Sequence, residues 1–82
     1  MIVSVSFFGL QRKLAQTDQI QVSLSSKIQR VADLFSYIRE KYPELSLSEE
    51  VVLVVVNDHA SSLDRRLRAN DEVSFLPHIG GG

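Results

Sequence analysis

One segment with helical periodicity is flanked on both sides by segments with strand periodicity, and this pattern restricts the possible folds most. Large apolar residues recur at spacings of three and four within Lys27–Tyr42, as in the buried stripe of an amphipathic helix. We predict a helix over this range, with Ser26 and Gln29 as its capping box and Pro43 as its stop.

Strand patterns lie on both sides of this helix. Apolar and polar residues alternate over Ile2–Phe8 and Gln19–Leu24, which predicts two strands that pair antiparallel and bury one face each. The largely β-branched run Val51–Val56 predicts a strand covered on both faces, in the middle of the sheet. A short strand over Ala60–Leu63 and a last strand over Glu72–Leu76 follow.

These elements predict an α+β domain of the β-grasp, or ubiquitin-like, type. It has a mixed sheet of about five strands with one main helix packed on one face. We assign residues 1–77 to this domain and residues 78–82 to a flexible C-terminal tail. Turns at Asn57–His59 and Asn70–Asp71 separate the late strands.

Charge and composition argue against several classes of function. Nine basic and ten acidic residues give a net charge of -1, without the basic excess of a nucleic-acid or membrane-surface binder. No apolar run approaches the roughly 20 residues of a membrane span. Cysteine is absent, which excludes disulfides, thiolate metal sites and a cysteine nucleophile. We therefore expect a cytoplasmic protein with no nucleic-acid and no membrane partner.

The polar residues do not form a recognisable catalytic set. His59 and His78 are isolated, and no metal-ligand spacing is present, so we expect no metal site. The acidic pairs Glu49–Glu50 and Asp71–Glu72 are interpreted as solvated charges. A basic cluster is interpreted as a surface turn, with a docking patch for an acidic partner or a phosphate as the alternative; it comprises Arg65, Arg66 and Arg68.

The run Gly80–Gly82 is the most informative feature for function. It can be an inert, frayed end. Glycine also lets another protein's backbone approach closely, and the five residues after Pro77 can reach roughly 17 Å from the domain. A free carboxylate on Gly82 could be activated by ATP as an acyl-adenylate and then attacked by sulfur or nitrogen. Because the chain has no cysteine, carried sulfur would be a thiocarboxylate on this carboxyl.

The sequence resembles the ubiquitin-like sulfur carriers, most closely the small subunits of molybdopterin synthase. The similarity covers nearly the whole chain and is strongest over residues 67–82, where Asp71-Glu72-Val73, Pro77 and the terminal glycines match the family pattern. Two positions depart from it: Asn70 replaces a frequent glycine, and His78 replaces a frequent second proline. Because asparagine tolerates left-handed backbone, we expect the turn at Asn70 to be kept.

The resemblance implies that an adenylyltransferase related to ubiquitin-activating enzymes uses ATP to adenylate Gly82, which then becomes a thiocarboxylate. Gly80 and Gly81 would thread into the active site of the molybdopterin synthase large subunit, in a heterotetramer. There the sulfur would pass to the pterin precursor of the molybdenum cofactor. The chain would be a non-catalytic, sulfur-donating subunit with no tightly bound cofactor.

Two large apolar residues are predicted on the outward face of the sheet, near the tail. Phe8 falls on the serine side of the first strand, and Leu76 falls on the serine side of the last strand. We interpret them as a docking patch for the large subunit, with Ala60 and Ile79 as neighbours.

Three other functions stay open from the sequence. The chain could carry sulfur for thiamine or amino-acid biosynthesis, modify proteins as ubiquitin does, or be an interaction module with an inert tail. The long helix and the ending Phe75-Leu76-Pro77 favour molybdopterin synthesis over a thiamine carrier.

Overall fold

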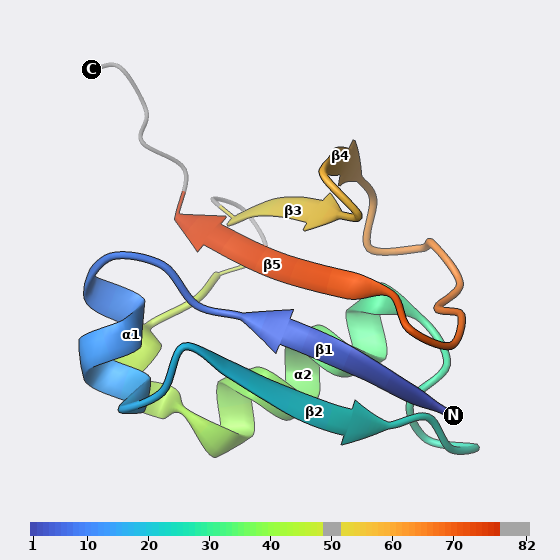
Figure 1. Cartoon of the computed structure of the whole chain (residues 1–82), viewed down its shortest axis with the longest axis horizontal. Coiled ribbons are helices and arrows are strands. Elements are labelled where there is room, and N and C mark those ends of the chain that lie inside the picture. The colour runs from blue at the N-terminus through green and yellow to red at the C-terminus, as the bar shows by residue number, and fades with distance from the viewer. Residues whose placement is uncertain (49–51, 78–82) are drawn as a thin grey trace.

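The computed structural model describes residues 1–48 and 52–77, which form a five-stranded sheet with a long helix on one face (Figure 1). The predicted mixed sheet with one main helix is confirmed. In chain order the elements are β1 (Ile2–Ser6), α1 (Leu10–Ala15), β2 (Gln19–Ser23), α2 (Val31–Lys41), the 3-10 helix η1 (Pro43–Leu45), β3 (Val52–Val56), β4 (His59–Ser61) and β5 (Glu72–Pro77).

The strand order across the sheet is β2-β1-β5-β3-β4. The antiparallel pairing of β1 with β2 is confirmed, and β3 and β4 form a second hairpin. The last strand, β5, lies between the two hairpins, parallel to β1 and antiparallel to β3 (Figure 1). The central position is therefore taken by the last strand of the chain.

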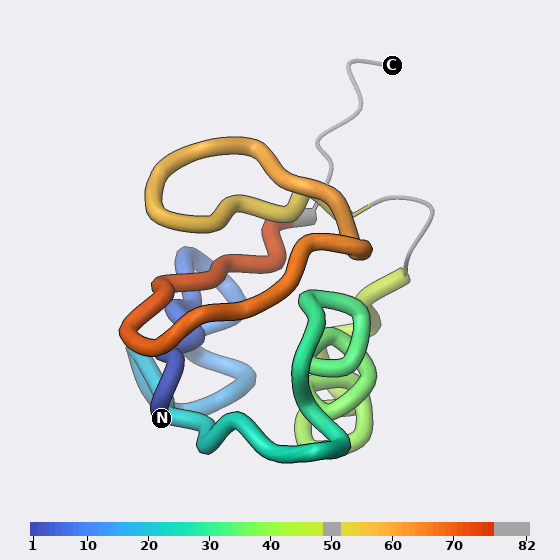
Figure 2. Tube along the Cα trace, turned by 90° about the vertical axis from the view of Figure 1, so that its right-hand side faces the viewer, coloured from blue at the N-terminus to red at the C-terminus, as the bar shows by residue number. Residues whose placement is uncertain are grey.

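The prediction that the Val51–Val56 run is covered on both faces is wrong, although β3 does lie inside the sheet, between β5 and β4. Strand β3 lies beside the edge strand β4, and the side chain of Leu53 is 42% exposed. Figure 2 shows α2 on one side of the sheet only. Because β3 is covered on one face, its residues alternate between the core and the surface. Val51 itself lies outside the described residues.

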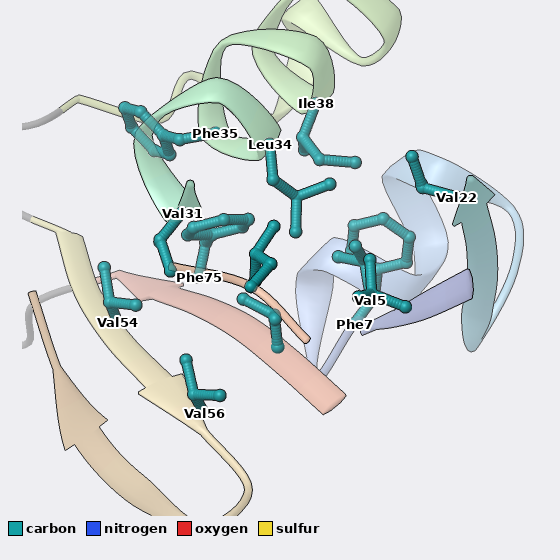
Figure 3. Close-up of a cluster of buried hydrophobic side chains, with 13 residues drawn as sticks. Val5, Phe7, Val22, Val31, Leu34, Phe35, Ile38, Val54, Val56 and Phe75 are labelled. Atoms are coloured by element: carbon teal, nitrogen blue, oxygen red, sulfur yellow. The ribbon is translucent and has the colours of Figure 1, made fainter. Parts of the chain in front are cut away.

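The core fills the space between α2 and the inner face of the sheet (Figure 3). The rings of Phe35 on α2 and Phe75 on β5 pack with centroids 5.2 Å apart. Phe7 meets Tyr42 edge to face at 5.3 Å. The buried apolar residues are Val3, Val5, Phe7, Val22, Val31, Leu34, Phe35, Ile38, Val54, Val56, Leu67, Val73 and Phe75.

The main helix is shorter than predicted, because it begins at Val31 rather than Lys27 and ends at Lys41. Residues Ser25 and Ile28 exchange two backbone hydrogen bonds of 3.2 Å in a tight turn. The Ser25 hydroxyl also accepts a hydrogen bond from the Lys27 amide at 3.1 Å. This local alternative to the helix accounts for the late start.

The predicted capping box of Ser26 and Gln29 is wrong, and Asp33 takes the capping role. Its carboxylate accepts hydrogen bonds from the backbone amides of Gln29 at 3.0 Å and Arg30 at 2.9 Å. The bond from the Gln29 amide, followed by that from Arg30, holds the pKa of Asp33 below its usual value. A carboxylate in the first turn also favours the helix dipole.

Helix α1 has no counterpart among the predicted elements. The first strand ends at Ser6 rather than Phe8, and Gly9 has φ 55° and ψ -129°, which glycine adopts most readily. The amide of Gln11 donates to the carbonyl of Phe8 at 3.0 Å, which closes a tight turn over residues 8–11. This turn takes the chain out of the sheet and into α1.

The late turns follow the predicted chemistry with shifted boundaries. Asn57 and Asp58 both have positive φ, 50° and 69°, as a type I′ hairpin turn requires. The following strand is His59–Ser61 instead of Ala60–Leu63, so His59 belongs to β4. Asn70 has φ 71°, which confirms the left-handed turn expected there.

Candidate docking surface and the base of the tail

The structure describes three of the predicted site residues: Phe8, Ala60 and Leu76. The other four, Ile79, Gly80, Gly81 and Gly82, lie outside the described residues. The site that can be built from the structure is therefore the surface around the end of β5, from which the tail continues.

Leu76 lies on the outer face of the sheet, as predicted. Its neighbour Phe75 points into the core, and strand alternation turns Leu76 to the opposite face (Figure 3). In the antiparallel pairing of β3 with β5, Leu53 lies directly opposite Leu76. Two large apolar side chains are thus paired on the face that α2 leaves uncovered.

Strand β3 adds a second residue to this surface, since Val55 lies opposite Ala60 of β4. We call the four outward apolar residues of β3, β4 and β5 the outer patch: Leu53, Val55, Ala60 and Leu76. The prediction contained Ala60 and Leu76 but missed Leu53 and Val55. These two residues belong to a continuous apolar run, so no alternation with polar residues indicates which side chains face solvent.

Phe8 lies at the same end of the sheet as Leu76. Ser6 is opposite Ser74 in the parallel pairing of β1 with β5, and Phe8 and Leu76 each follow two residues later. The side chain of Phe8 is 56% exposed, so this end of the sheet presents a further large apolar side chain to solvent. The structure therefore places Phe8 and Leu76 at the same end of the sheet, whereas Ala60 lies on the edge strand β4, with β3 between it and β5.

Gln11 is a site residue that the sequence analysis missed. It is buried at 7% exposure, on the first turn of α1. Its Nε2 donates a hydrogen bond of 2.6 Å to the backbone oxygen of Phe75, and its Oε1 lies 3.5 Å from the amide of Phe8. Figure 1 shows α1 at the end of the sheet where β5 ends. A polar residue in a short amphipathic segment carries no sequence signal for a contact 64 residues away.

Asp71 anchors the other end of β5, and its interpretation as a solvated charge is wrong. The residue is 5% exposed and accepts hydrogen bonds from the Arg65 side chain at 2.9 Å, the Arg68 amide at 2.8 Å and the Asn57 side chain at 2.9 Å. Burial acts to raise the pKa of Asp71, but the bonds from Arg65, Arg68 and Asn57 outweigh it and lower that pKa. The residue fixes the start of the strand that leads to the tail.

Two residues of the basic cluster, Arg65 and Arg68, belong to the Asp71 anchor, whereas Arg66 binds elsewhere. The Arg65 side chain binds Asp71, and the Arg66 side chain donates to the Gln29 side chain at 3.2 Å.

Within residues 1–48 and 52–77, no group of three or more His, Asp or Glu side chains is placed to hold a metal ion. No helix of this described part is both long and apolar enough to cross a membrane.

Comparison with known proteins shows the family of this chain. The family model described as the ThiS family matches residues 5–82. Over 81 residues the chain is 31% identical to the molybdopterin synthase sulfur carrier subunit of Mycobacterium tuberculosis, an alignment that covers 98% of this chain and 96% of that protein.

Two solved structures share the fold. One is a chain in the protein–protein complex of subunits 1 and 2 of molybdopterin-converting factor from Helicobacter pylori, with TM-score 0.68, 25% identity and full coverage of both chains. The other is SAMP1 from Haloferax volcanii, with TM-score 0.79, 19% identity and full coverage of both chains. The β-grasp architecture predicted from the sequence is confirmed, and the chain belongs to the ThiS family.

Proposed function

We propose that this protein is a sulfur carrier for molybdopterin synthesis, with Gly82 as the reacting residue. The observation that carries the proposal is the apolar outer patch, in which Leu53 and Leu76 pair beside the end of β5, in a ThiS-family chain with a terminal glycine run. The exposed Phe8 lies at the same end of the sheet. The 31% identity to a molybdopterin synthase sulfur carrier subunit supports this pathway over thiamine or amino-acid biosynthesis.

The chemistry takes place on the terminal carboxylate. Its oxygen attacks the α-phosphorus of ATP, which releases pyrophosphate and leaves an acyl-adenylate. Sulfide then attacks the carbonyl carbon, so a carbon–sulfur bond forms while the bond to AMP breaks. The thiocarboxylate sulfur then bonds to a carbon of the pterin precursor and displaces an oxygen substituent from it. Water cleaves the acyl–sulfur bond, so the sulfur stays on the pterin and the carboxylate is restored. The absence of cysteine supports the terminal carboxyl as the carrying group.

Catalytic side chains are supplied by two partners in this proposal. An adenylyltransferase related to ubiquitin-activating enzymes forms the adenylate, and the large subunit of molybdopterin synthase receives the tail in a heterotetramer. The Helicobacter pylori complex of subunits 1 and 2 supports a partner subunit. The outer patch and Phe8 are the docking surface, and Gly80 and Gly81 give the tail a width that a narrow channel admits.

The first test is intact-mass measurement after incubation with the adenylyltransferase, ATP and sulfide. We expect a gain that corresponds to exchange of one oxygen for one sulfur, and no gain in a variant that lacks Gly82. The loaded protein should then convert the pterin precursor when the large subunit is added. An unchanged mass, with an enzyme that loads an established carrier, would overturn the proposal.

Protein modification is the second candidate function. SAMP1, the small archaeal modifier protein 1 of Haloferax volcanii, has the same fold, and a modifier and a sulfur carrier share the chemistry as far as the adenylate. The same incubation distinguishes the two functions when a cell extract replaces sulfide. A modifier forms isopeptide-linked conjugates that survive reducing denaturation, whereas a dedicated carrier forms none.

A further inference from the structure

We propose that Gln11 is a positioning residue for the reactive tail: its buried carboxamide holds the end of β5 where β1 no longer does. The consequence for the reaction rests on the proposed sulfur-carrier function. The contact with β5 stands on the geometry of the described residues and is tested separately below.

Strands β1 and β5 part before β5 ends. Their pairing runs from Ser4 opposite Glu72 to Ser6 opposite Ser74, and β5 continues to Pro77. On the β1 side the chain has already left the sheet through the turn at Gly9. The backbone oxygen of Phe75 receives the Gln11 side chain at 2.6 Å on this edge. Gln11 therefore acts as a substitute for the missing strand.

The two hydrogen-bonding groups of Gln11 contribute unequally. The donor contact to Phe75 is short at 2.6 Å, whereas the acceptor contact with the Phe8 amide is long at 3.5 Å. The donor is thus the part that holds β5, and the acceptor adds a weak link to the turn. A substitution that removes only the donor separates these two effects.

Because Gln11 is buried, its hydrogen bond to the Phe75 oxygen is strong, and loss of this bond is destabilising. Gln11 lines a groove of about 170 Å³ whose other described lining residues are uncharged: Leu10, Leu14, Leu45, Ser46, Leu47, Ser48 and Val52. A carboxamide buried beside leucines is destabilising unless it is hydrogen-bonded. An apolar side chain would fill this space without needing a hydrogen bond. The hydrogen bond to Phe75 therefore explains why a glutamine occupies this position.

The contact matters because the other edge of β5 is already fixed. Leu53 and Val52 of β3 lie opposite Leu76 and Pro77. With Gln11 on the first edge and β3 on the second, the strand is held from both sides up to Phe75. Loss of the Gln11 contact leaves the last residues of β5 held by β3 alone, so they separate from the sheet more often, which lengthens the tail. A longer tail places its tip at one point less often.

The test uses two variants and a control in the full chain. Gln11→Met keeps the length of the side chain and removes both hydrogen bonds. Gln11→Glu keeps the shape, but an ionised carboxylate cannot donate to Phe75, whereas a protonated carboxyl can. The control is Ile38→Val, a core substitution on α2 that destabilises the domain and leaves the Gln11 side chain unchanged. The kcat values of the variants are compared at a temperature at which all of them are folded.

Two readouts are measured: the kcat and KM of thiocarboxylate formation, and backbone amide exchange along β5. For Gln11→Met we expect a fall of about tenfold in kcat, since small misplacements of reacting groups reduce rates strongly. Amide exchange should accelerate at Leu76 and stay slow at Val73. Ile38→Val should keep the wild-type kcat. For Gln11→Glu, the kcat relative to wild type should recover as the pH falls and the carboxyl regains its proton.

A wild-type kcat and wild-type exchange at Leu76 in Gln11→Met would overturn the inference. An equal loss of kcat in Ile38→Val would also overturn it, because the effect would then follow stability alone. Failure of the wild-type protein to gain sulfur would overturn the proposed function instead, and the exchange at Leu76 would still decide whether Gln11 holds β5.

Discussion

Leu53 and Leu76 lie directly opposite each other on antiparallel strands, on the face of the sheet that α2 leaves uncovered. Neighbouring residues of the same two strands, Val54 and Phe75, are also opposite each other and are buried against α2. One pair therefore stabilises the domain, while the other is available to a partner. The pair also places an apolar surface next to the residue from which the tail continues.

The first prediction concerns binding of the large subunit. Leu53→Asp and Leu76→Asp should each weaken binding by about 2 kcal/mol or more, because each places a charge in the apolar centre of the proposed interface. Isothermal titration with the large subunit measures the change. The matched control is Gln21→Asp, an exposed position on β2 opposite the outward Ser4.

Binding that is unchanged in Leu53→Asp would remove β3 from the docking surface. Equal losses in Leu53→Asp and Gln21→Asp would show a general effect of negative charge rather than a patch. The double variant of Leu53 and Leu76 should lose less binding free energy than the sum of the single variants, since the two residues lie directly opposite each other across the strands.

The second prediction concerns the anchor at the start of β5. Asp71→Asn should lower the free energy of unfolding by about 2 kcal/mol, because a neutral amide replaces a buried acceptor of charged and backbone donors. Urea denaturation at neutral pH measures this loss. Glu72→Gln, at an exposed neighbouring position, is the control and should be close to wild type.

The third prediction is the acid dependence of the same group. Because the pKa of Asp71 is lower in the folded protein than its ordinary value of 3.8, the folded state binds fewer protons there. Its contribution to stability is complete above the unfolded pKa and is lost as the pH falls through the folded pKa. The stability gap between wild type and Asp71→Asn should therefore narrow below about pH 4. A gap that is constant down to the acid transition would contradict this assignment.

The fourth prediction concerns the left-handed residue before β5. Asn70 has φ 71°, so Asn70→Val should cost about 1–3 kcal/mol of unfolding free energy, because a β-branched residue is strained in this region. Asn70→Gly should be within about 0.5 kcal/mol of wild type, since glycine adopts this conformation freely. Thermal unfolding of both variants checks the order, and a more stable Asn70→Val would contradict it.

The fifth prediction concerns the turn that takes the chain from β1 into α1. A Cβ at Gly9 would meet nothing within 4 Å, so the cost of Gly9→Ala comes from its φ of 55° and not from a clash. We expect a loss of about 1–3 kcal/mol. Urea denaturation measures this loss, and Ala69→Gly, at an exposed position outside the helices and strands, is a control for a change of the same size. Wild-type stability of Gly9→Ala would show that the turn tolerates another conformation.

Patterns within a few residues were sufficient to predict much of this domain. The spacing of Leu34, Phe35 and Ile38 predicted the buried face of α2, and alternation predicted the first hairpin. The turn at Asn70 followed from the backbone preference of one side chain. Such features depend on the periodicity and the steric preferences of neighbouring residues, so they can be predicted without knowledge of the tertiary structure.

The errors arose where competing partners or distant segments decide the structure. The helix begins at Val31 because the turn at Ser25 and the cap at Asp33 compete successfully with the predicted capping box. Asp71 is buried because Arg65 and Asn57 come from other segments to meet it. Neither outcome follows from the residue types alone, since each depends on which alternative hydrogen bond the packed chain permits.

The candidate site shows the same division. The outward direction of Leu76 could be predicted from the amino-acid order, because strand alternation is a local property. Phe8 is exposed as predicted, but it lies beyond the end of β1 rather than on a strand face. The glycine run lies outside the described residues. The insertion of β5 between two hairpins, the exposure of Leu53 and the contact of Gln11 with Phe75 could not be predicted from the amino-acid order. These three depend on strand pairing between segments far apart in the chain, and such pairing is selected by the burial of the whole core at once.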